Sequence, residues 1–512
     1  MAASLFRALG TIIICIVGSG DSMQLSAKHA NQQSILQSDF TGGLNTSYFD
    51  SDIAANELSL CTNMEVDRDT GLLRTCKGLR KLCTVNVDVT NAAYDVLNRT
   101  FLLFTEDYHV YATTDFLRIN DVGKLTGTEK VVTTLWESGV IIASGGKLQY
   151  YDGTSLKTLE TSPEHCKGAY TRSGRVLTFD DGDQVLYSGV GDETNWKQES
   201  NDPSTALFAQ IGYKVGGKIM GAINLSSDIL FIKDNGMVFR LQNEYPDWKI
   251  SELGRNIYCR STTGFTNIGD NVIILGNSTL QSITTTQDYG DMKPANIGQK
   301  ISREIDALPP DTKLRYVPAW NQLWFIGHTN YVLVMDCRTG GFFERTFEEP
   351  VVDIISADNK VYLIRKNAVC DFIDDFTDCG TPLHFLAKFK TNQSVQHILV
   401  KKVLLGITPY DTYTEDTQSR LTVGKLSYRF PRRIAGSIQP ETSPHAEARI
   451  PTSPFLRENT SPVFMNDERV TPTGILMFRA RAIYRSSRVP VQIEGVGYSF
   501  ILNYIGYDMA IV

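Results

Sequence analysis

The stretch that decides the fold is Phe101-Leu-Leu-Phe104 followed by His109-Val-Tyr111, because the same pair of runs returns along the chain. The first run consists of β-forming residues and the second adds an aromatic or large apolar side chain. Six further first runs follow at intervals of about 36 to 53 residues, near the period of a four-stranded propeller blade; they begin at Val140, Val176, Ile229, Val272, Leu323 and Val361. The matching second runs begin at Leu148, Val185, Met237, Leu280, Val332 and Ala368.

Turn-forming residues separate the two runs of each pair. Examples are Ser144-Gly-Gly146, Asp180-Asp-Gly-Asp183 and Asp234-Asn-Gly236, which supply the positive φ angles that tight hairpins need. The pattern predicts a β-propeller of about seven blades over residues 91–379.

Length and composition set the frame for this prediction. A chain of 512 residues is expected to form two or three domains. Aromatic residues make up 10% of the chain and helical periodicity is scarce, which favours an all-β protein. Residues 380–512 carry 16 Lys+Arg against 10 Asp+Glu, so their net charge is +6 and that of residues 1–379 is −13. This basic end either faces an anionic partner or is a solvated imbalance.

The flanking segments have a different character from the repeats. Strand-like patterns at residues 39–90, 380–430 and 475–512 predict a second, sandwich- or barrel-like β domain into which the propeller is inserted. Residues 431–474 hold seven of the 18 prolines, mixed with Ser and Thr, and are expected to be an extended arm or a loop. Residues 1–38 are expected to be an N-terminal extension, because the apolar run Ala8–Val17 outlines a leader and Met23 offers an alternative start.

Several short patterns in these flanks resemble one family. They are Asp39-Phe-Thr-Gly-Gly-Leu-Asn45, Asn56-Glu-Leu58, Asn63-Met64 and Gly71-Leu-Leu-Arg-Thr-Cys-Lys-Gly78, with Asp192-Glu-Thr-Asn-Trp196 inside the propeller and Gly495-Val-Gly497 near the end. Together they resemble the nozzle, or DNA-stabilisation, proteins of short-tailed bacteriophages and related tail-tube proteins. Glu193 stands where that family has a proline. The residues that carry the resemblance are Asp39, Phe40, Gly42, Gly43, Asn45, Asn63, Gly71, Arg74, Gly78, Trp196, Gly495 and Gly497.

The resemblance implies a structural virion protein, assembled in the host cytoplasm, rather than an enzyme. It further implies a homo-oligomeric ring, a hexamer by analogy, that contacts other tail, adaptor and portal proteins, continues the DNA channel, retains the genome and conducts it during infection. A contact with the host surface would also be consistent with such a protein. Nine cysteines without any Cys-x-x-Cys pair fit free thiols in a reducing compartment.

Four arginines near the C-terminus are candidates for DNA contact. A ten-residue segment of a predicted strand contains all four: Arg479, Arg481, Arg485 and Arg488. These side chains could line a channel through contacts to phosphates. The alternative is an exposed sheet face or edge protected by charge.

No pattern predicts a catalytic, cofactor-binding or metal-binding residue, and no cofactor is expected. Gly212 to Lys218 fits a phosphate-binding loop up to its last position, where Ile219 replaces the required Ser or Thr. Acidic clusters at residues 180–183 and 371–378 lack the spacing of an EF-hand, although such turns can hold Ca²⁺. The seven histidines show no metal spacing.

Two other classes stay open at the level of sequence. One is a secreted propeller that binds glycans or acts on them, which the N-terminal apolar run favours. The other is a cellular propeller that serves as a scaffold for protein partners. Ring assembly distinguishes the virion protein from both, because each alternative predicts a monomer.

Overall fold

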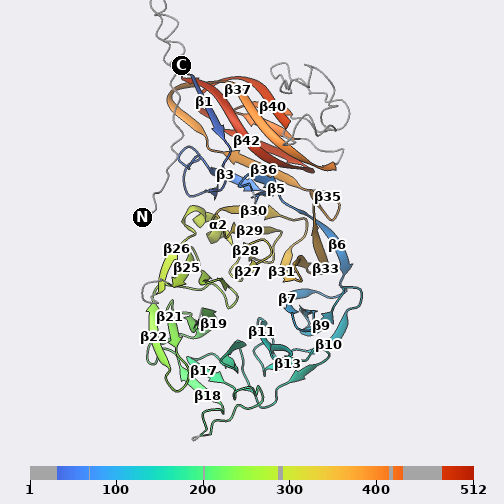
Figure 1. Ribbon diagram of the computed structural model, residues 1–512, viewed down its shortest axis with the longest axis vertical. Coiled ribbons are helices and arrows are strands. Elements are labelled where there is room, and N and C mark those ends of the chain that lie inside the picture. Colours follow the sequence, from blue (N-terminus) through green and yellow to red (C-terminus); the bar gives the residue numbers. More distant parts are fainter. Residues whose placement is uncertain are drawn as a thin grey trace, which may run out of the picture.

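The computed structural model describes residues 32–67, 70–199, 202–225, 227–285, 292–413, 419–429 and 476–511. The protein is all-β: a seven-bladed propeller is inserted into a second domain made by strands from both ends of the chain (Figure 1). Helical turns in the described residues are limited to η1 (Gln299–Ile301) and α2 (Ser302–Ala307), between blades five and six. No helix in the described residues is long and apolar enough to span a bilayer.

Five blades are separate four-stranded antiparallel sheets. They are β7 (Val89–Asp95), β8 (Thr100–Thr105), β9 (His109–Thr113) and β10 (Asn120–Lys124); β11 (Val132–Trp136), β12 (Gly139–Ala143), β13 (Gln149–Tyr151) and β14 (Leu156–Thr158); β15 (Tyr170–Arg172), β16 (Arg175–Phe179), β17 (Gln184–Tyr187) and β18 (Leu207–Gln210); β19 (Ile219–Leu225), β20 (Asp228–Lys233), β21 (Val238–Gln242) and β22 (Lys249–Gly254); and β23 (Phe265–Ile268), β24 (Asn271–Leu275), β25 (Leu280–Thr285) and β26 (Met292–Asn296).

Blades six and seven connect to the rest of the chain. Blade six is β27 (Lys313–Val317), β28 (Gln322–Ile326), β29 (Tyr331–Asp336) and β30 (Phe342–Thr346). Blade seven is β31 (Val351–Ala357), β32 (Lys360–Arg365), β33 (Ala368–Ile373) and β6 (Gly78–Thr84), with β34 (Thr377–Asp378) and β35 (Thr381–Pro382) continuing its sheet. The expectation that residues 39–90 all belong to the second domain is therefore wrong for β6, which pairs with β33 and closes the ring of blades.

The second strand of a blade lies deepest, because neighbouring blades cover both of its faces. Every residue of β8, β12, β16, β20 and β28 is buried. Between blades one and two, for example, Leu102 and Phe104 pack with Val140 and Ile142 in one apolar cluster. The seven first runs of the predicted repeat coincide with these second strands, and the seven second runs with the third strands.

The second domain is a β-sandwich. Its first sheet contains β1 (Gln32–Gln37), β4 (Met64–Val66), β5 (Leu73–Thr75), β42 (Tyr498–Ile511), β37 (Asn392–Tyr413) and β40 (Leu476–Val489). Its second sheet extends blade six through β2 (Gly43–Leu44), β3 (Glu57–Thr62), β36 (His384–Phe389), β41 (Val491–Val496), β38 (Arg420–Val423) and β39 (Leu426–Arg429). The sheets meet where the rings of Phe385 and Phe500 contact edge to face, with centroids 5.1 Å apart.

Some expectations fall at the edges of the described residues. β1 lies within the expected extension of residues 1–38, yet it pairs with β42 as part of the sandwich. Residues 431–474, expected to be an arm or loop, lie outside the described residues, as does the apolar run Ala8–Val17. The eight described cysteines are free thiols, and the Sγ atoms of Cys370 and Cys379 lie 3.8 Å apart.

Candidate functional site at the junction of the propeller and the second domain

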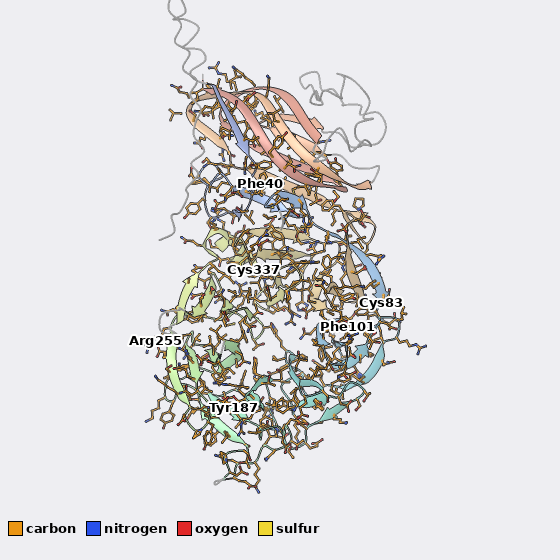
Figure 2. The ribbon with its side chains drawn as sticks, in the orientation of Figure 1. Phe40, Cys83, Phe101, Tyr187, Arg255 and Cys337 are labelled. Carbon is orange, nitrogen blue, oxygen red and sulfur yellow. The ribbon has the colours of Figure 1, made fainter. Side chains whose placement is uncertain are left out.

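The turn from Asp39 to Gly43 docks onto blade six. Asp39 Oδ1 accepts hydrogen bonds from the backbone N and the Oγ1 of Thr41, at 2.9 and 2.6 Å. Gly43 has a φ of +63°, and a Cβ there would lie 2.6 Å from the backbone N of Phe342 in β30. Glycine alone meets both demands. Phe40 is fully buried, and Figure 2 shows it at the base of the second domain, where this domain meets the propeller.

Asn45 and Gly42 attach the same turn to β3 and to the residue that precedes it, Asn56. Asn45 Nδ2 donates to Glu57 Oε2 at 2.8 Å, and the backbone N of Gly42 donates to the carbonyl of Asn56 at 3.2 Å. Lys300 Nζ, from η1, lies 2.5 Å from Glu57 Oε1. Burial raises the pKa of Glu57, but Lys300 and the donated hydrogen bonds outweigh it and hold that pKa below its ordinary value. A buried carboxylate thus joins the second domain to the segment between blades five and six.

Asn63, between β3 and β4, contacts two other strands, β30 and β36, through one side chain. Its Nδ2 donates to Thr346 Oγ1 and to the carbonyl of His384, both at 2.7 Å, and its Oδ1 accepts from the backbone N of Thr346 at 2.8 Å. Its backbone N also donates to the carbonyl of Glu344 at 2.8 Å. Asn63 has a φ of 54°, in the left-handed region that Asn tolerates better than most residues. Blade six and β36 are therefore held together at this position.

Arg74 closes the hairpin that turns at Gly71. Its Nη2 lies 2.8 Å from Glu65 Oε1 and its Nη1 lies 3.2 Å from Asp67 Oδ1. The other oxygen of Glu65 accepts from Gln322 Nε2 of blade six at 3.0 Å. The arginine of the motif thus acts on the propeller through a buried carboxylate.

The three remaining glycines of the flanking motifs lie in the same region. Gly495 lies in β41, where a Cβ would come 2.7 Å from ring carbons of Phe385, so glycine allows β41 and β36 to approach. The backbone N of Gly497 donates to the carbonyl of Leu383 at 2.8 Å. Gly78 begins β6, where the chain leaves for the propeller. Apart from Gly78, which pairs with Ile373 in blade seven, the structure therefore brings the flanking motif residues together between blade six and the sandwich.

Trp196 is the exception and lies between blades two and three. Its Nε1 donates to the carbonyl of Glu193 at 2.7 Å, and Trp136 Nε1 donates to Glu193 Oε2 at 3.0 Å. The glutamate that departs from the family pattern thus has a local role: it joins two tryptophans. Trp196 packs beside an apolar cluster that includes Trp136 and Cys166.

The candidate DNA-contacting arginines all lie on β40, which is an edge strand of its sheet. Their backbone partners in β37 are Leu404 for Arg479, Lys402 for Arg481, Leu399 for Arg485 and Gln393 for Arg488. Arg485 is exposed. The Arg488 guanidinium is paired with Asp50, a carboxylate that also lies 2.9 Å from Lys388 Nζ. Arg488 is thus engaged in the sandwich, whereas DNA contact by the others stays a prediction.

In both acidic clusters, lysine or arginine side chains form ion pairs with aspartates. Asp181 lies 2.8 Å from Lys167 Nζ and 3.3 Å from Lys218 Nζ. In the second cluster, Asp378 lies 2.6 Å from the Arg365 guanidinium. The described residues contain no group of three or more His, Cys, Asp or Glu side chains placed to hold a metal ion. The loop that resembles a phosphate-binding motif connects β18 to β19, between blades three and four.

A charged cluster at the propeller axis was not predicted from the sequence. Asp353 of β31 is fully buried; its Oδ1 lies 2.7 Å from Arg315 Nε and its Oδ2 lies 3.2 Å from Lys313 Nζ. Asn91 Oδ1 of β7 accepts from Arg315 Nη2 and from Lys313 Nζ, both at 3.1 Å. The sequence feature that could have indicated this cluster is the pair of charged residues Lys313 and Arg315, which precede the apolar run at Leu323 and so fall on the first strand of a blade. This cluster joins blades six, seven and one.

Comparison with known proteins leaves the family open. No family model and no curated protein matches the chain. Solved propellers are similar: the WD40 β-propeller domain of Doa1 gives a TM-score of 0.39 at 13% identity, over 58% of this chain and 97% of that one. The Pan2 WD40 domain of Neurospora crassa gives 0.39 at 9% identity, over 58% and 95%. BamB from Moraxella catarrhalis gives 0.36 at 10% identity, over 56% and 82%. At these values the similarities carry no argument about function.

Proposed function

We propose that this chain is a structural protein of a bacteriophage tail. Copies of it form a ring, hexameric by the resemblance, that continues the DNA channel below the portal and adaptor proteins. The ring retains the packaged genome in the virion and conducts it during infection. The proposal assigns the chain no catalytic step.

One observation carries the proposal. The residues that resemble the nozzle and tail-tube family come from both ends of the chain, and all except Trp196 in the propeller and Gly78 in blade seven lie at a single junction. Asn63, for example, bonds to Thr346 of blade six and to His384 of β36, which are separated from it by 283 and 321 residues. A resemblance made of unrelated short matches would scatter over the structure, whereas this one marks how the two domains are joined.

The two domains suit different tasks in such a ring. β37 has 22 residues and β40 and β42 have 14 each, whereas strands in globular proteins usually have about 5 to 6 residues. Strands of this length suit the wall of a tube, and the propeller then projects from it as a docking module. The ring requires a heterologous interface that closes by rotation.

The oligomeric state of the full chain tests the proposal. We expect negative-stain images and light scattering to show closed rings, for the protein alone or after mixing with the neighbouring tail proteins. A preparation that stays monomeric at every concentration, with and without those neighbours, would contradict it. Circular dichroism showing β structure confirms that a monomeric sample is folded.

A further inference from the structure

The propeller axis contains two open cavities. The first axial cavity has a volume of about 310 Å³ and is lined by inner strands of blades one to six. The second axial cavity has a volume of about 350 Å³ and is lined mainly by blades one, two, six and seven. Thr133 and Arg315 line both, so the Arg315 guanidinium lies at the boundary between them.

The lining of the first axial cavity mixes polar and apolar side chains and includes no carboxylate. Its polar side chains come from Asn91, Thr133, Asn224, Thr266, Asn267 and Arg315, among others. Arg315 is the one charged residue among the described residues that line either cavity. Hydroxyl and amide groups can bond to a hydroxylated ligand, and a single arginine selects an anionic one.

The charges behind this lining do not balance. Asp353 is a single carboxylate between Lys313 and Arg315. Lys130 and Asp311, which carry opposite charges, also act on Lys313 or on its neighbour His328. Burial lowers the pKa of His328, so the imidazole is neutral at pH 7. In the ion-pair cluster two cations, Lys313 and Arg315, therefore face one carboxylate, and the cluster carries a net charge of +1.

Arg315 also has hydrogen-bonding capacity left. Its Nε and Nη2 donate to Asp353 and Asn91, and Nη1 has no acceptor among the described residues. One third of the side chain is exposed. The orientation is fixed from behind by a fully buried carboxylate, so an anion that reaches Nη1 meets a preorganised donor.

We propose that the first axial cavity binds a small hydroxylated carboxylate, of the class of the hexuronic acids, with its carboxylate on Arg315 Nη1. The threonine and asparagine side chains then bond to its hydroxyl groups. A volume of about 310 Å³ lies at the small end of ligand pockets, which suits one sugar ring. The site does not depend on ring assembly and can exist whether or not the proposed function holds.

Calorimetry of the full chain with glucuronate and with glucose tests the site. We expect glucuronate to bind and glucose, which lacks the carboxylate, to bind at least tenfold more weakly. Thr266→Phe, which fills the first cavity, should weaken glucuronate binding at least tenfold. Ser356→Phe, which fills the second cavity, should leave it unchanged. Equal binding of both sugars, no binding of glucuronate, or binding unaffected by Thr266→Phe would overturn the proposal.

Two further measurements separate this site from general attraction to a basic protein. Arg315→Lys keeps the charge but removes Nη1. We expect this variant to weaken glucuronate binding at least tenfold and to change the melting temperature of the free protein by no more than a few degrees. If this variant unfolds, Asn267→Leu takes its place; it removes a polar lining group together with the hydrogen bond from Asn267 Nδ2 to the carbonyl of Asn224. Unweakened binding in the folded variant contradicts the proposal. An oligosaccharide that ends in glucuronate distinguishes sources: tighter binding than the free sugar assigns the site to a glycan terminus, and weaker binding assigns it to a free acid.

Discussion

At the scale of single residues, Asp353 decides the charge balance of the propeller axis. It is fully buried and holds Lys313 and Arg315 by direct ion pairs. Removing one partner of a buried pair leaves an uncompensated charge and costs about 3 to 5 kcal/mol. We therefore expect Asp353→Asn to lower the free energy of unfolding by about that amount, measured by urea denaturation.

A matched control for this variant exists on the surface. Asp371 also pairs with an arginine, Arg80, whose side chain is 64% exposed. Exposed pairs contribute at most about 1 kcal/mol, so Asp371→Asn should change the unfolding free energy little. Equal losses in the two variants would show that Asp353 has no special place in the cluster.

Lys313 gives a pH dependence with a defined sign. Burial, with repulsion from Arg315 and Lys130 and despite the attraction of Asp353, lowers the pKa of Lys313 to about 8. The unfolded chain keeps this proton up to its ordinary pKa, so between these values the unfolded state binds more protons and stability from this group rises with pH. We expect the stability of the wild type relative to Lys313→Met to increase from about pH 8 to about pH 10. A constant difference in melting temperature across this range would contradict it.

At the scale of elements, the docked turn before β2 depends on a close backbone contact. Gly43 and Gly340 both have positive φ, but a Cβ at Gly340 would meet nothing within 4 Å, whereas one at Gly43 would meet the backbone of Phe342. Gly340→Ala should therefore cost only the backbone strain, about 1 kcal/mol. Gly43→Ala should cost about 1 to 3 kcal/mol more, measured by thermal unfolding. Equal losses of stability in the two variants would mean that the backbone of Phe342 moves away from a Cβ at position 43 at no cost.

The sequence predicts blade strands unequally, for a physical reason. Second and third strands such as β8 and β9 are covered by neighbouring blades, so they are apolar runs that stand out. Inner strands face the axis and carry polar residues, as β27 does at Lys313 and Arg315. Outer strands face solvent, as β10 does. Neither the inner nor the outer strands show a clear periodicity in the sequence. Because the inner strands were not predicted, the charge cluster that they carry at the axis was not predicted either.

The junction was predictable in part. The flanking motifs marked the residues that meet there, but sequence gave no means of placing β6 in blade seven rather than in the sandwich. Its residues Arg80 and Lys81 are adjacent and stand between Leu79 and Leu82, a pattern that suits a strand of either sheet. The partners that the motif residues hold, such as Gln322 and Thr346, lie in blade six and carry no local signal.

At the scale of the whole molecule, the basic edge strand tests the channel. Neutralising Arg479, Arg481 and Arg485 together should weaken genome retention or slow DNA ejection in assembled particles, because contacts to phosphate are electrostatic. A control triple, Lys157→Gln, Arg255→Gln and Lys366→Gln, removes the same charge from the propeller surface, where these side chains are 63%, 70% and 55% exposed. Unchanged retention and ejection in the first variant, or equal changes in both, would exclude a channel role for this strand.

The closure of blade seven has a consequence for biosynthesis. Arg80 of β6 pairs with Asp371 of β33 across 291 residues of sequence. At ribosomal rates of about 5 to 20 residues per second, β6 emerges on the order of 15 to 60 seconds before its partner. During that interval β6 has no partner strand, and Leu79, which is buried in the folded protein, is exposed to solvent. We expect the charges of Arg80 and Lys81 to keep this unpaired strand from pairing with another chain until the propeller closes.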